Sequence, residues 1–131
     1  MKKLLFVILF FIPFLCDAQI HLGLRLSELQ ELYPEDKFII ELNDSGTKYT
    51  SFEGDFGTYV YYFDKETHQI NYMIQIMENV GGLNAQVEEF NKQYVIISDT
   101  SWRAYLEEGK IIKIKLLYNK ELKASYFEYV E

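Results

Sequence analysis

The feature that most constrains the fold of this 131-residue chain is a succession of short aromatic and β-branched segments separated by turn residues. Segments of this kind are typical of β-strands joined in hairpins. The pattern predicts eight strands, over residues 38–42, 48–53, 58–63, 69–77, 94–97, 101–107, 110–118 and 122–130. The chain therefore favours a meandering antiparallel sheet.

Two further segments have the pattern of helices. Ser27 is placed to cap the first helix and Gln30 to complete a capping box, with Leu29, Leu32 and Tyr33 as its apolar stripe. Pro34 then ends this helix. The second helix follows Gly81 and Gly82, and its apolar positions are spaced by four, three and four residues: Leu83, Val87, Phe90 and Tyr94.

A shift of 55 positions superimposes parts of the chain. It places Gly54 on Gly109, Tyr72 on Phe127 and residues 63–66 on residues 118–121. An internal repeat explains these matches, and so do turn residues that hairpins share for local reasons. We predict an α+β fold in which two helix-plus-antiparallel-meander halves, about 20–77 and 80–131, form a two-layer domain with the helices on one face of the sheet.

Residues 20–29, Ile-His-Leu-Gly-Leu-Arg-Leu-Ser-Glu-Leu, resemble the opening of the small exported domains related to β-lactamase inhibitor protein and the SmpA/OmlA group. In those domains an apolar-Gly-apolar step leads into a Ser- or Thr-capped helix, and a hairpin sheet follows. The second half departs from this pattern, because residues 80–84 keep glycine but lack the capping Ser or Thr. The resemblance implies a non-enzymatic domain that binds another protein through its sheet.

The N-terminus has the pattern of an export signal. Lys2 and Lys3 precede an apolar run from Leu4 to Leu15, which is too short to span a bilayer. Cleavage between Ala18 and Gln19 makes residues 1–18 a signal peptide and 19–131 a single periplasmic or secreted domain. The alternative is a lipoprotein signal that anchors the domain to a membrane through an acylated Cys16, although the preceding Leu15 is larger than such a signal requires.

Composition excludes several classes of function. Cys16 is the only cysteine, so the exported domain has neither a disulfide nor a thiolate metal site. Without its leader, the chain carries 11 basic and 19 acidic residues, a formal charge of −8. This charge argues against nucleic acid and anionic membranes as partners, because both require a basic face.

We expect the partner to be another protein or a second copy of the chain. Two short helices cannot cover both faces of eight strands, and several strands carry apolar residues on both faces. Such a sheet leaves an apolar face open, and exposed apolar patches mark interfaces. The pattern of alternation predicts the following residues for the open-face patch: Tyr62, Met73, Met77, Phe127 and Tyr129.

The chain carries no recognisable catalytic motif. His21 and His68 are its only histidines, and they are expected to be solvated, at the new N-terminus and in a hairpin turn. We therefore predict no catalytic residue, metal or cofactor. The alternative is a small exported hydrolase acting on cell-wall or host glycan, with carboxylates from neighbouring turns: Glu53, Asp55, Asp64 and Glu66.

Overall fold

A computed structural model describes residues 20–54 and 57–131. The cleavage position at Ala18 and Gln19, the lipidation candidate Cys16 and the acidic residue Asp55 lie outside these ranges. The described part contains two α-helices, α2 (Leu26–Leu32) and α3 (Val80–Gln93), and a short 3-10 helix, η1 (Glu107–Gly109). Neither of its α-helices is long and apolar enough to cross a membrane.

Eight strands complete the secondary structure. They are β1 (Glu41–Leu42), β2 (Lys48–Glu53), β3 (Gly57–Phe63), β4 (Ile70–Met77), β5 (Val95–Ser98), β6 (Ser101–Tyr105), β7 (Ile111–Asn119) and β8 (Ala124–Val130). Most bounds lie within two residues of the prediction. The first strand is shorter than predicted, because residues 38–40 pair with no neighbouring strand.

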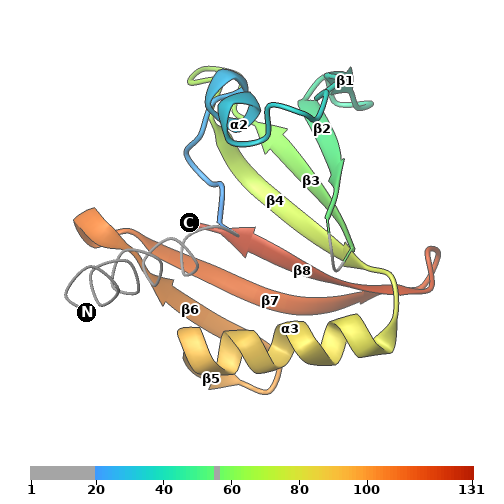
Figure 1. Cartoon of the computed structure of the whole chain (residues 1–131), viewed down its shortest axis with the longest axis vertical. Helices are drawn as coiled ribbons and strands as arrows, with labels where there is room; N and C mark the ends of the chain where they lie inside the picture. Colours follow the sequence, from blue (N-terminus) through green and yellow to red (C-terminus); the bar gives the residue numbers. More distant parts are fainter. Residues whose placement is uncertain (1–19, 55–56) are drawn as a thin grey trace, which may run out of the picture.

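All eight strands belong to one antiparallel sheet with the order β1-β2-β3-β4-β8-β7-β6-β5. Strands β4 and β8 lie side by side at its centre, and the sheet extends from them through β3 to β1 and through β7 to β5 (Figure 1). This sheet and the two helices confirm the mixed α+β class predicted from the sequence.

Helix α3 packs on one face of the sheet through Phe90. The Phe90 ring lies edge-on to Phe127, with ring centroids 4.9 Å apart, and also contacts the rings of Trp102 and Tyr129. All four side chains are buried. Asn79 caps this helix, because its side-chain oxygen accepts a hydrogen bond of 2.7 Å from the backbone N–H of Gly82.

Helix α2 begins two residues earlier than a Ser27 cap requires, so that prediction is wrong. Arg25 is the N-cap residue, and its backbone N–H donates to Glu28 Oε1 at 3.1 Å. Ser27 lies inside the first turn. Leu29 of the predicted apolar stripe is fully buried, whereas Leu32 is largely exposed.

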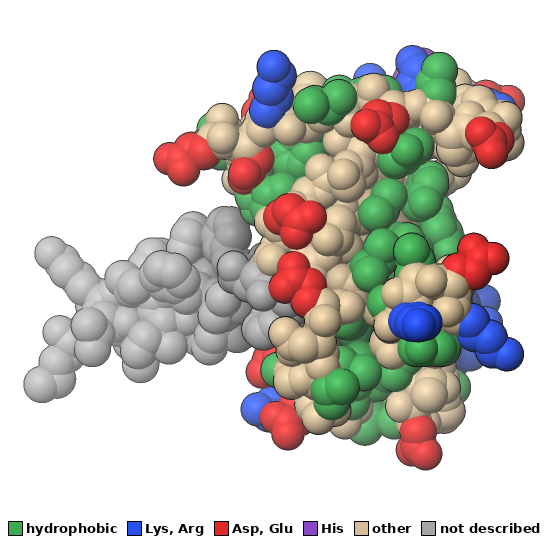
Figure 2. Space-filling model, turned by 90° about the vertical axis from the view of Figure 1, so that its right-hand side faces the viewer, with side chains coloured by type: hydrophobic (Ala, Val, Ile, Leu, Met, Phe, Trp, Pro, Cys, Tyr) green, Lys and Arg blue, Asp and Glu red, His purple; other side chains and the backbone are tan. Residues whose placement is uncertain are grey.

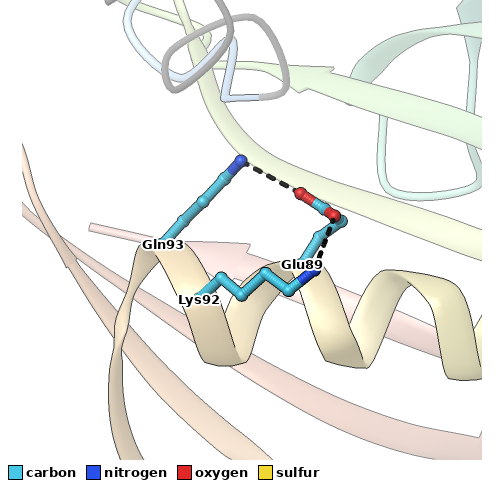
Figure 3. A network of polar contacts seen from close by, with 3 residues as sticks. All are labelled: Glu89, Lys92 and Gln93. Carbon is cyan, nitrogen blue, oxygen red and sulfur yellow. Dashed lines mark hydrogen bonds and ion pairs between the residues drawn. The ribbon is translucent and has the colours of Figure 1, made fainter. Parts of the chain in front are cut away.

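The outer side of α3 is polar. Figure 3 shows Glu89 between two neighbours of the same helix: Gln93 donates a hydrogen bond of 3.4 Å to it, and Lys92 lies 3.9 Å away as an ion pair. Exposed pairs of this kind add only ~0.3–0.5 kcal/mol to helix stability. Both contacts join residues of α3 to one another and not to the sheet.

Candidate functional site

The sheet face opposite α3, here called the open face, does not carry the predicted set of residues. Met73, Met77, Phe127 and Tyr129 are buried in the core. Of the predicted patch, Tyr62 alone is only half-buried. The prediction that the other four form an exposed patch is therefore wrong.

A β-bulge explains the error in β4. Tyr62 of β3 pairs with Tyr72, but the next residue, Phe63, pairs with Ile70, so Asn71 is an extra residue in β4. Side chains alternate along a strand, and one extra residue reverses the face of every residue that follows it. Ile70 is consequently buried on the α3 side, whereas Tyr72, Ile74 and Ile76 lie on the open face, half-buried.

The paired residues of this face form continuous rows across the strands. The longest row runs through all eight strands, as the register of every pair shows: Glu41, Tyr49, Tyr62, Tyr72, Val130, Lys113, Arg103 and Val95. A second row lies beside it: Ser51, Val60, Ile74, Glu128, Lys115 and Ser101. A third row adds Thr58, Ile76, Tyr126 and Leu117.

One half of the open face is aromatic. The ring centroids of Tyr49 and Tyr62 lie 5.8 Å apart, and those of Tyr62 and Tyr72 lie 5.4 Å apart. These separations are those of favourable aromatic pairs. Because each tyrosine packs against the next across β2, β3 and β4, the row presents an ordered apolar surface with polar tips. Rigid tyrosine surfaces of this kind lose little conformational entropy on binding.

The centre of the open face holds one acid. Glu128 accepts a hydrogen bond of 2.6 Å from the Tyr72 hydroxyl. Partial burial and the bond to this carboxylate raise the pKa of Tyr72. The tyrosine therefore stays protonated and donates, and its bond fixes the carboxylate next to Lys115, the cross-strand partner of Glu128.

The other half of the open face is basic. Lys113 and Lys115 are exposed on β7, and Arg103 is the direct cross-strand partner of Lys113 on β6. Like charges in this position weaken a sheet, so the pairing gives this fold no stability.

Figure 2 shows how the hydrophobic and charged side chains are distributed over the surface. The side of the molecule that faces away from the helices of Figure 1 lies to the right in this view. Hydrophobic side chains (green) gather along its middle, where the outline is hollowed; an acidic side chain (red) and then Lys and Arg (blue) lie below them. The surface therefore combines an apolar centre with a basic flank.

Most residues of the open face were not predicted from the sequence: Tyr72, Ile74, Ile76, Tyr126, Arg103, Lys113 and Lys115. A signal for the basic part was present, because Lys113 and Lys115 alternate with the buried Ile112 and Ile114. Such alternation marks the exposed face of a strand. Tyr72 had no comparable signal, since the bulge at Asn71 that separates its face from that of Ile70 leaves no mark in the sequence.

The two histidines have different surroundings. His68 is exposed in the β3–β4 turn with a φ of +61°, as expected for a turn residue. The prediction that His21 is solvated is wrong: it is 4% exposed, and its Nδ1 lies 3.0 Å from the Tyr61 hydroxyl. Its Nε2 lies 3.3 Å from the hydroxyl of Tyr33. These contacts give His21 a structural role between α2 and the sheet.

Two of the predicted acidic turn residues, Glu53 and Asp64, lie far apart. Glu53 ends β2, opposite the start of β3, whereas Asp64 follows the end of β3. The length of β3 separates them by roughly 20 Å, far more than the ~5–10 Å between the carboxyl groups of a glycosidase pair. Asp64 also stabilises its own turn, because its carboxylate accepts hydrogen bonds from the backbone N–H groups of Thr67 and Glu66. These bonds lower the pKa of Asp64.

Residues 20–54 and 57–131 contain no group of three or more His, Cys, Asp or Glu side chains that could hold a metal ion. No protein-family model, curated protein or solved structure matches the chain. The open face is accordingly the most developed candidate site in the described part of the protein.

Proposed function

We propose that this chain is an exported, non-catalytic binding domain that engages a protein partner through the open face. The observation that carries the proposal is the continuous row of eight paired residues that joins an aromatic half of the face to a basic half. Interface cores are rich in aromatic residues and arginine, and their rims are polar. The open face has this composition.

The charges of the face favour one class of partner surface. The basic residues of the face lie close together on β6 and β7, beside the apolar centre: Arg103, Lys113 and Lys115. The partner surface that fits is an apolar patch with acidic residues on one side, because complementary charges speed association and fix orientation. The negative net charge of the whole chain disfavours nucleic acid as an alternative anion.

We further propose that the architecture consists of two related halves in two layers. Two turns support it. In the β3–β4 turn, Asp64 accepts from the N–H of Thr67 and His68 has a positive φ; 55 residues later, Asn119 accepts from the N–H of Leu122 and Lys123 has a positive φ. One helix followed by four strands occurs twice along the chain, and this order also supports the resemblance to β-lactamase-inhibitor-like and SmpA/OmlA-like domains.

The export part of the proposal rests on the leader pattern of residues 1–18. It is tested separately, by expressing the full chain and sequencing the N-terminus of the exported product. A free product that begins at Gln19 supports periplasmic or secreted localisation. A lipidated product that begins at Cys16 contradicts the cleavage position and places the domain on a membrane.

The binding part is tested with matched variants. The protein is used to capture proteins from the extracellular or periplasmic fraction of its own source, and the captured partner is then purified and its affinity is measured. Ile76→Asp disrupts the apolar centre of the open face, whereas Ile97→Asp makes the same change at the exposed edge strand β5. A charge inserted into a desolvated interface core costs about 2 kcal/mol or more, roughly a 30-fold loss of affinity.

The proposal predicts that Ile76→Asp abolishes capture and that Ile97→Asp leaves the affinity unchanged, with both variants folded by circular dichroism. A purified partner that binds both variants equally contradicts the open-face assignment. If the captured partner is the chain itself, the face is a dimer interface rather than a site for a different protein.

A further inference from the structure

A second feature lies away from the open face, at the end of the molecule near α2. A cavity of about 310 Å³ opens there between the start of α2, the segment before β1, and strands β2 and β3. Its lining residues are Leu26, Ile40, Phe63, Lys48 and His68. Three of the five are apolar, and the other two carry the basic groups.

The apolar wall continues outside the cavity. Leu42 is the cross-strand partner of Lys48, and direct partners lie on the same face of a sheet. Leu42 is nevertheless 65% exposed. The cavity therefore has an apolar interior and an exposed apolar residue next to its basic residue, an arrangement that fits a flexible apolar chain rather than a compact polar molecule.

A smaller hollow of about 90 Å³ adjoins the cavity and shares Lys48, Phe63 and His68 with it. It adds a second lysine, Lys65, whose Nζ donates to the backbone oxygen of Ser45 at 3.2 Å. The one acid in its lining is Asp64, whose carboxylate is already bonded by backbone N–H groups of its turn. Positive groups thus outnumber negative ones at this opening.

We propose that this cavity binds a single-chain amphiphile with an anionic head, of the class of medium-chain fatty acid carboxylates. The apolar chain packs between Leu26, Ile40 and Phe63, and the carboxylate lies next to Lys48. A volume of about 310 Å³ is at the small end of ligand pockets, so it takes one short chain and excludes a lipid with two. This site is independent of the open face and of the protein partner proposed for it.

Decanoate is the probe, titrated below its micelle concentration and followed by calorimetry and by the methyl resonances of Leu26 and Ile40. Decyltrimethylammonium, which has the same chain and a cationic head, is the ligand control. Lys48→Glu reverses the charge at the cavity, and Lys120→Glu makes the same change in the exposed β7–β8 turn. Ile40→Asp alters the wall of the cavity, with Ile97→Asp as its control.

We expect saturable binding of one decanoate with shifts of both methyl resonances. Lys48→Glu should weaken it by about fivefold, as expected for an exposed ion pair, and Ile40→Asp by about tenfold, whereas both control variants bind as the parent does. The cationic amphiphile should also bind at least about tenfold more weakly. Three results each overturn the proposal: non-saturable decanoate binding, equal affinity in Lys48→Glu and Lys120→Glu, or equal affinity for the two head groups. Circular dichroism of each variant confirms that a loss is not unfolding.

Discussion

The Tyr72 hydroxyl donates a hydrogen bond of 2.6 Å to Glu128 Oε2. This bond joins β4 and β8, the central strands of the sheet, through two residues that lie 56 positions apart in sequence. It holds the one acid at the centre of the open face in a fixed position, between the aromatic half of the face and its basic half. The preorganisation of the proposed binding surface therefore depends on it.

Tyr72→Phe should lower the free energy of unfolding by about 1 kcal/mol at pH 7, because a half-buried hydrogen bond to a carboxylate is lost. Because the pKa of Tyr72 in the folded state is raised above 10.0, its contribution is complete below about pH 10 and is lost as the pH rises towards the folded-state pKa. Urea unfolding between pH 7 and 11 measures both effects. The variant should lose less stability with rising pH than the parent.

Tyr126→Phe is the control for this experiment, since Tyr126 also lies on the open face but has a different neighbourhood, beside Ile76. Removal of the Tyr126 hydroxyl should change the free energy of unfolding by a few tenths of a kcal/mol. Equal losses in the two variants would mean that the Tyr72–Glu128 bond contributes nothing of its own.

The helix caps give a second prediction. Asn79→Ala removes the side chain that accepts from Gly82 N–H and should cost about 1 kcal/mol of stability. Ser27→Ala should be nearly neutral, because Ser27 lies inside α2 and Arg25 is the cap. Urea unfolding of both variants is the measurement. A larger loss for Ser27→Ala than for Asn79→Ala would restore the cap position predicted from the sequence.

The packing of α3 on the sheet depends on Phe90. Phe90→Ala leaves a cavity against Trp102, Phe127 and Tyr129 and should cost about 3–5 kcal/mol. Trp102 is the only tryptophan of the chain, so its fluorescence reports the unfolding of this contact directly. Glu88→Ala, on the exposed side of the same helix, should change stability by less than about 0.5 kcal/mol. Similar losses for both variants would contradict the observed packing.

The two histidines should differ sharply when replaced. His21→Ala removes a buried partner of the Tyr61 and Tyr33 hydroxyls and should cost about 2–3 kcal/mol. His68→Ala changes an exposed turn residue, and its effect should be within about 1 kcal/mol. Thermal unfolding of the two variants compares them directly. If the two midpoints fall equally, His21 is not the buried residue that the structure describes.

The sequence predicted the strands well because their limits depend on local chemistry. Residues such as Gly54, Asp64 and Asn119 cannot easily continue a strand, so they mark its ends. The first strand was overestimated, since residues 38–40 have strand-like side chains but no partner strand. Pairing is a property of the whole sheet and is not visible in a segment.

The face of the sheet on which each side chain lies was predicted less well, and this determines which residues form the candidate site. Alternation assigns Met73 and Tyr72 to opposite faces, but which face α3 covers depends on the bulge at Asn71 and on the position of Phe90. Neither is a local property of the sequence. His21 was missed for the same reason, because Tyr61 and Tyr33, its partners, are 40 and 12 residues away.

The most direct test of the central claim places a photo-crosslinking amino acid at one position of the chain and exposes the partner complex to light. The open-face account predicts efficient crosslinking of the purified partner from position 76, at the centre of the face, and none from position 88, on the exposed side of α3. Crosslinking from position 88 without crosslinking from position 76 would contradict the account and assign the interface to the helix side of the sheet.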